Sequence, residues 1–146
     1  MAYMYSPKTG LLWDKRPTKL YYCTGEFGII NNLITYAELF GSLSCIDAAK
    51  NIFTRIVNRI YDGERNENAC FCHGKATLLY FLKKFRFLLN EIPLQYIEIE
   101  RTIRDQLIKS LKHNELNQSL LNGENGILLS LFHTHANSVE RALLLH

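Results

Sequence analysis

Apolar residues recur at intervals of three and four over most of the chain, a spacing that predicts amphipathic helices. One such stretch runs from about Leu43 to Tyr61, and another begins after Pro93, a residue that suits an early helix position. The apolar face of the first stretch comprises Ile46, Ala49, Ile52, Phe53, Ile56, Val57 and Ile60. No stretch alternates convincingly between apolar and polar residues, so the sequence indicates an all-α fold.

The stretch after Pro93 has a less regular pattern. Its apolar side comprises Ile97, Ile103, Leu107 and Leu111, and its polar side comprises Glu100, Arg104 and Lys112. We therefore expect the first set to face the core and the second to face solvent. The run from Lys83 to Arg86 is expected to be a solvated helix face, and the polar segment 62–66 a loop.

Three glycine segments lie in register at a fixed interval. They read Cys-Thr-Gly-Glu-Phe-Gly-Ile from residue 23, Cys-His-Gly-Lys-Ala-Thr-Leu from residue 72 and Leu-Asn-Gly-Glu-Asn-Gly-Ile from residue 121. Their first glycines are Gly25, Gly74 and Gly123, and both intervals are the same: 74 − 25 = 49 and 123 − 74 = 49. The second copy has Thr77 where the other two have a second glycine. Equal spacing of this kind is typical of a repeat protein.

Each glycine segment leads into a short apolar stretch at helical spacing, and a longer amphipathic stretch follows the first two. The repeat unit is therefore predicted to be a helix pair, which buries both faces only when pairs stack. We expect one domain over residues 1–146, with the short glycine-led helices as an inner layer. Their N-termini would then lie side by side at one end of the array.

Possible metal ligands occupy matching places in the first two repeats. Position one is Cys23 and then Cys72, position two includes His73, and the third repeat offers no ligand at either position. Packed helices lie about 8–10 Å apart, a distance that ligands from both sides can span. Two thiolates and an imidazole suit zinc, and three protein ligands leave the fourth position of a catalytic site open. These residues predict a zinc centre.

Other interpretations stay open at this stage. A single cysteine is often a small buried apolar residue, so a helical domain without metal is an alternative. Cys70 could be a fourth ligand that closes a structural site, but the equivalent residue in the first repeat is Tyr21, so we expect a bystander. Cys45 belongs to no constellation and is expected to pack in its helix.

Composition excludes several classes of protein. The chain has 146 residues, 47% of them apolar, and a formal net charge of +3, which suits one packed domain and does not indicate nucleic-acid binding. No apolar run approaches the roughly 18 residues that span a bilayer. Residues 1–10 do not resemble a signal peptide, so the cytoplasm is the expected compartment and the four cysteines are expected to be thiols or ligands.

The three motifs resemble those of the lanthionine synthetase C-like family. The segment from Cys23 resembles that family's W-C-Y-G-D-P-G motif, the segment from Cys72 is similar to C-H-G-x-A-G, and the segment from Leu121 is similar to L-x-G-x-A-G-I. Order and spacing agree, and the likeness extends from about Leu20 to Leu145.

This resemblance implies a fold, a metal and an activity. The family fold is an α/α toroid of seven helix pairs, with zinc held by residues that map onto Cys23, Cys72 and His73. Family cyclases bind a cysteine thiol of a dehydrated precursor peptide at zinc, and its addition to dehydroalanine or dehydrobutyrine forms a thioether (lanthionine) ring. A histidine and an aspartate from earlier repeats transfer protons. A dehydratase and transporter complex, peripheral to the membrane, is a further partner that the resemblance implies.

The chain also departs from the family pattern. Only three of the glycine repeats are present, an incomplete barrel that resembles the C-terminal part of a family member. Lys19 stands where the family usually has arginine, Thr24 where it has tyrosine, and Phe27 where it has proline. An open arc of three repeats would expose an apolar edge, which a partner or residues 1–18 could cover.

Two functions follow from these observations. In the first, the chain is the zinc-bearing part of a thioether-forming cyclase, and a second chain supplies the earlier repeats. In the second, it is a truncated, non-catalytic zinc-binding module that recognises a peptide thiol or stabilises a complex.

Overall fold

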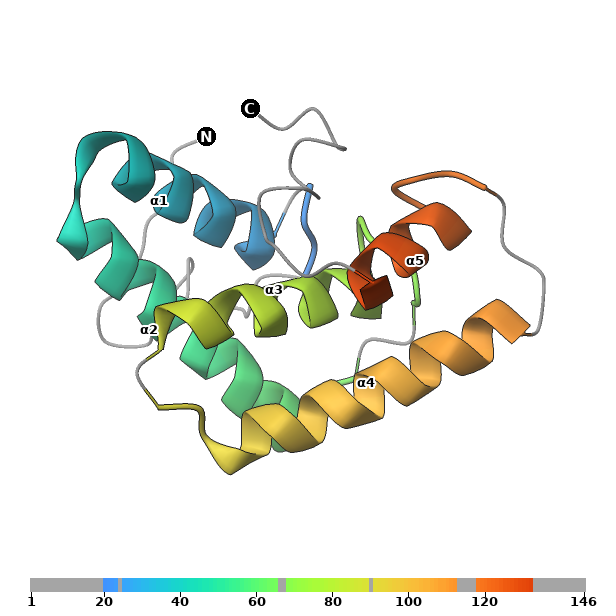
Figure 1. The fold of residues 1–146 in the computed structure, drawn as a ribbon. Helices are drawn as coiled ribbons and strands as arrows, with labels where there is room; N and C mark the ends of the chain where they lie inside the picture. The colour runs from blue at the N-terminus through green and yellow to red at the C-terminus, as the bar shows by residue number, and fades with distance from the viewer. Residues whose placement is uncertain (1–19, 24, 66–67, 90, 113–117, 133–146) are drawn as a thin grey trace. The chain divides into compact units, whose positions relative to one another are not determined.

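The computed structural model describes residues 20–23, 25–65, 68–89, 91–112 and 118–132. The chain divides into two compact units, residues 1–65 and residues 66–146, and each unit is described by itself. The described residues form five helices and no strand, which confirms the predicted all-α fold (Figure 1). Residues 1–18, Lys19 and Thr24 lie outside the described residues.

The first unit is a hairpin of two helices, α1 (Glu26–Phe40) and α2 (Leu43–Tyr61), which pack against each other (Figure 1). Gly41 ends α1 with a φ of 67°, and its N–H donates to the carbonyl of Ala37 at 2.8 Å. This left-handed conformation favours glycine and reverses the chain within two residues. The buried residues of α2 are Ala49, Ile52, Phe53, Ile56 and Val57, all from the predicted apolar face.

The second unit contains α3 (Lys75–Leu88), α4 (Leu94–Lys112) and α5 (Glu124–Phe132). Helix α3 packs against both α4 and α5, and α4 also contacts α5. Most apolar residues of α3 are buried. They are Ala76, Leu78, Leu79, Tyr80, Phe81, Leu82 and Phe85. A helix that is apolar on most sides is expected to lie inside its unit, and the structure places α3 there.

The predicted face of α4 was partly wrong. Ile97 is 43% exposed, whereas Glu100 is buried. The buried apolar face comprises Tyr96, Ile99, Ile103 and Leu107, and the Glu100 carboxylate shares this side because it pairs with Arg86 at 2.8 Å. Arg86 on α3 is thus the charged partner that the buried Glu100 carboxylate on α4 needs.

The prediction of a solvated face over residues 83–86 was wrong except at Arg86, which is exposed. Lys84 is only 4% exposed, and its ammonium lies 5.9 Å from the centre of the Tyr80 ring. Lys83 is half-buried and donates from Nζ to the carbonyl oxygens of Ser130 and Leu131, at 2.6 and 2.8 Å. These carbonyls belong to the last turn of α5, where backbone acceptors have no partner within the helix.

The glycine-led helices are the shorter ones, as the repeat predicted. Helices α1, α3 and α5 have 15, 14 and 9 residues, and α2 and α4 have 19 each. Each short helix begins directly after the first glycine of its segment, at Glu26, Lys75 and Glu124. Two helix pairs, α1 with α2 and α3 with α4, therefore follow the predicted order of short and long helices. The repeat arrangement, its closure into a toroid and the single-domain assignment stay predictions.

Candidate metal centre

Cys72 and His73 bring two ligand atoms together just before α3. The Cys72 Sγ lies 3.5 Å from the His73 Nε2. For one tetrahedral zinc ion, bond lengths of about 2.3 Å to sulfur and about 2.0–2.1 Å to nitrogen place the two ligand atoms about 3.6 Å apart. Cys72 is buried and His73 is half-buried, so the imidazole remains reachable from outside. The separation of these two atoms fits a shared zinc ion.

Hydrogen bonds within residues 68–76 hold this pair in place. The Cys70 N–H donates to Asn68 Oδ1 at 2.9 Å, and the His73 N–H donates to the Cys70 Sγ at 3.3 Å. The first helical residue, Lys75, donates its N–H to the Asn68 carbonyl at 2.8 Å. The loop is therefore closed onto the N-terminus of α3, and Cys70 serves it as an acceptor.

Gly74 is required because this loop folds back on itself. A Cβ at Gly74 would lie 2.3 Å from the Asn68 carbonyl oxygen and 2.6 Å from that of Cys70. Both neighbours are backbone atoms, which cannot swing aside. Any larger residue would push the loop away from the helix and move His73 with it.

The third repeat supports the second. The Cys72 N–H donates to the carbonyl oxygen of Leu121 at 2.8 Å. In the same region a Cβ at Gly126 would lie 2.9 Å from the Cβ of Phe71. The loops before α3 and α5 therefore lie against each other, as the repeat predicted for successive helix N-termini.

Cys23 occupies the equivalent place in the first unit, where it is exposed just before α1. The N-cap residues Gly25 and Gly74 have nearly identical backbones, with φ and ψ of −136° and −164° in one and −138° and −164° in the other. Cys23 lies three residues before the first residue of its helix, and Cys72 lies three before its own. The two cysteines therefore stand at the same distance before helices whose N-cap residues have matching backbones, although Cys23 is exposed and Cys72 is buried.

The second glycine of the first and third segments has a common structural reason. A Cβ at Gly28 would lie 2.2 Å from the Tyr22 carbonyl oxygen, and one at Gly126 would lie 2.0 Å from that of Leu120. In both cases the obstructing carbonyl is six residues earlier: 28 − 22 = 6 and 126 − 120 = 6. The loops of the first and third repeats thus approach their helices in the same way.

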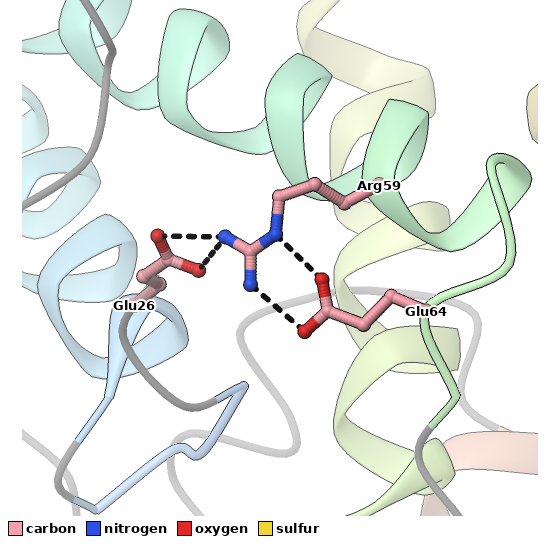
Figure 2. A network of polar contacts seen from close by, with 3 residues as sticks. All are labelled: Glu26, Arg59 and Glu64. Carbon is pink, nitrogen blue, oxygen red and sulfur yellow. Dashed lines mark hydrogen bonds and ion pairs between the residues drawn. The ribbon is translucent and has the colours of Figure 1, made fainter. Parts of the chain in front are cut away.

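A charged cluster braces the start of α1. The Arg59 Nη1 donates to both Glu26 carboxylate oxygens at 3.1 and 2.8 Å, while its Nε and Nη2 donate to Glu64 at 2.6 and 2.9 Å (Figure 2). The Glu26 side chain is 1% exposed and that of Arg59 20%. Burial alone would lower the pKa of Arg59, but the hydrogen bonds and negative charges of Glu64 and Glu26 outweigh it and raise that pKa above its usual value. The guanidinium therefore stays charged and bridges the two carboxylates.

The sequence did not indicate every residue that shapes these loops. Arg59 and Glu26 are 33 residues apart, and no motif links them. Cys70 was expected to be a bystander, and the structure gives it a hydrogen bond to the loop backbone. Its only sequence signal was its closeness to Cys72 and His73.

A model of the lanthionine synthetase C-like protein family matches residues 4–144 of the chain. The chain belongs to this family. The match covers nearly all of the 146 residues and confirms the resemblance that the three glycine motifs carried. No curated protein matches the chain, and no solved structure does.

Family membership gives the loop residues a context. The lanthionine synthetase C-like resemblance implies a zinc site of two cysteines and a histidine, and the 3.5 Å separation of the Cys72 Sγ and the His73 Nε2 is compatible with it. None of the four cysteines forms a disulfide, so each sulfur is available to ligate a metal as a thiolate. Among the described residues, no helix is long and apolar enough to cross a membrane.

Proposed function

We propose that Cys23, Cys72 and His73 together hold one zinc ion, to which each offers one ligand atom. The observation that carries this proposal is the 3.5 Å separation of the Cys72 Sγ and His73 Nε2, which matches two ligands of one tetrahedral ion. Cys23 is the third ligand because it occupies the same position as Cys72 in an equivalent loop. Two thiolates and one neutral imidazole give a site of no net charge around Zn²⁺, with a fourth position for a substrate.

The substrate we propose is a dehydrated precursor peptide that carries a cysteine. Zinc, when bound, lowers the pKa of a thiol that ligates it and so supplies a thiolate at neutral pH. The peptide sulfur then adds to the β-carbon of a dehydroalanine or dehydrobutyrine, the electron pair of the double bond moves to the α-carbon, and a proton is delivered there. The product is a thioether ring, and no oxidant or reductant is consumed.

The protein's own residues position the ligands for this step. Cys70 and the Leu121 carbonyl hold the backbone of the Cys72–His73 loop, and burial of Cys72 shields its sulfur from water. We propose that a second chain with the earlier repeats supplies the group that delivers the proton.

The experiment uses the full chain with a dehydrated peptide that contains one cysteine and one dehydroalanine. Because ring formation does not change mass, it is followed by the loss of thiol alkylation in a mass spectrum. We expect cyclisation when a chain with the earlier repeats is added, and none when Cys72→Ala replaces the wild type. Cys45→Ala, a change outside the loops, should keep full activity. A zinc-loaded wild type that cyclises no peptide under any of these conditions would leave the non-catalytic zinc module as the function.

A further inference from the structure

Glu26 is the first residue of α1, and its carboxylate is buried, which is unusual for an acidic side chain at the start of a helix. Its side chain is 1% exposed, and both of its oxygens accept hydrogen bonds from Arg59. A buried carboxylate without a charged partner would be costly, so the Glu26 position depends on where the guanidinium lies. Arg59 is in turn held on its other side by Glu64 (Figure 2).

This cluster ties the Cys23 end of α1 to the last turns of α2. Glu26 begins α1 and lies three residues after Cys23, whereas Arg59 lies near the end of α2 and Glu64 in the loop that follows. The four hydrogen bonds from one planar guanidinium fix both carboxylates at once. Lysine has the same charge but cannot bind two carboxylates in this forked manner. The start of α1, three residues after Cys23, is thus held by an arginine that lies 33 residues after Glu26.

We propose that Arg59 is a positioning residue for the metal site, which acts on Cys23 through Glu26. This inference rests on the proposed zinc site. Side chains that orient a ligand from outside the first coordination sphere commonly contribute about 10- to 100-fold to metal affinity. The Arg59 contribution belongs near the lower end of that range, since it acts through the helix start and not on the ligand atom.

The direction in which metal affinity changes when Arg59 is replaced distinguishes a positioning role from a purely electrostatic one. Removal of a positive charge near a cation site should strengthen metal binding if charge alone matters. Loss of positioning should weaken it. Arg55, one turn earlier on α2 and not part of the cluster, provides the matched control because Arg55→Ala removes the same charge from the same helix.

The test is titration of the full chain with Co²⁺, whose thiolate charge-transfer band reports bound sulfur directly. Each titration is run well below the melting temperature of its variant, with helix content checked by circular dichroism. We expect Arg59→Ala to weaken Co²⁺ binding by about 10-fold and to reduce the band. Arg55→Ala should bind as the wild type does or slightly more tightly, and Arg59→Lys should fall between the wild type and Arg59→Ala.

Equal or tighter binding by Arg59→Ala would overturn the proposal. Should Arg59→Ala not fold, Arg59→Lys decides alone, because it keeps the charge and changes only the geometry; wild-type affinity in that variant would also overturn it. If the wild type binds Co²⁺ and both Arg59→Lys and Arg59→Ala bind it with the same affinity, the proposed zinc site stands and only the positioning role of Arg59 is refuted. A wild type that binds no metal would remove both.

Discussion

Cys72 donates its backbone N–H to the carbonyl oxygen of Leu121 at 2.8 Å, and the two residues occupy the same position in successive repeats, since 121 − 72 = 49. Residues that lie one repeat interval apart in the sequence are therefore in direct contact within the second unit. Because Cys72 is a proposed ligand, the third repeat contributes to the site although it offers no ligand of its own. Changes that loosen α5 should therefore also weaken the support of the Cys72 loop.

Lys83→Met should loosen α5. The substitution keeps most of the side-chain volume but removes the two hydrogen bonds from Nζ to the Ser130 and Leu131 carbonyls. Because hydrogen bonds from a charged group contribute more than neutral ones, we expect a loss of about 1–3 kcal/mol in the free energy of unfolding. Urea denaturation measures it, and Lys109→Met on the exposed side of α4 serves as the control. Equal stability of the two variants would count against the role of Lys83.

Gly126→Ala and Gly28→Ala should both destabilise the chain. Alanine in place of glycine usually stabilises a helix by about 0.5–1 kcal/mol. Here the added Cβ would meet a backbone carbonyl oxygen at 2.0 Å in one case and 2.2 Å in the other, so we expect a loss of about 1–3 kcal/mol or more. Thermal unfolding gives the sign directly. Asn32→Ala on the exposed side of α1 is the control and should be neutral or stabilising; the same outcome for Gly28→Ala would refute the close approach.

Thr77→Val should stabilise the protein. Thr77 is fully buried, and its hydroxyl has no hydrogen-bond partner among the described residues. Valine has nearly the same shape without the hydroxyl, so removal of an unsatisfied group should add about 1 kcal/mol to the free energy of unfolding. The control is Thr102→Val, which loses an exposed hydrogen bond to the Glu98 carbonyl. A fall in stability for Thr77→Val would mean that its hydroxyl is satisfied.

Cys70→Ala should show whether Cys70 supports the loop or ligates the zinc. The Cys70 Sγ accepts a hydrogen bond from the His73 N–H at 3.3 Å, so its removal should lower zinc affinity while the protein still binds one zinc per chain. Competition with a chromophoric chelator measures the affinity. Complete loss of zinc, as expected for Cys72→Ala, would make Cys70 a ligand and contradict our assignment.

The sequence predicted where helices begin and end better than it predicted which helix faces are buried and which charged residues pair. The apolar spacing placed a helix over residues 43–61, which are the bounds of α2, and the glycine register placed the starts of α1, α3 and α5. These features are local, so a periodic pattern and a helix-capping glycine suffice. On α4, by contrast, Ile97 was expected to be buried and is exposed, because the choice between adjacent helix positions depends on neighbouring helices.

The same limit applies to the candidate site. Cys23, Cys72 and His73 were singled out because a repeat puts equivalent residues at equivalent places, and the matching backbones of Gly25 and Gly74 confirm that equivalence. The Arg59–Glu26 pair could not be predicted, since charged residues on a surface helix have many possible partners. Arg59 pairs with Glu26, 33 residues away, as well as with Glu64, and only the structure identifies the distant partner.

Metal analysis of the purified full chain tests the central claim most directly. Zinc content is measured by mass spectrometry after chelator washing at neutral pH, alongside Cys23→Ala, Cys72→Ala and His73→Ala, with Cys45→Ala as the control. We predict about one zinc per chain in the wild type and in Cys45→Ala, and a clear loss in each of the three ligand variants. A folded wild type without zinc, or ligand variants that keep it, would contradict the account.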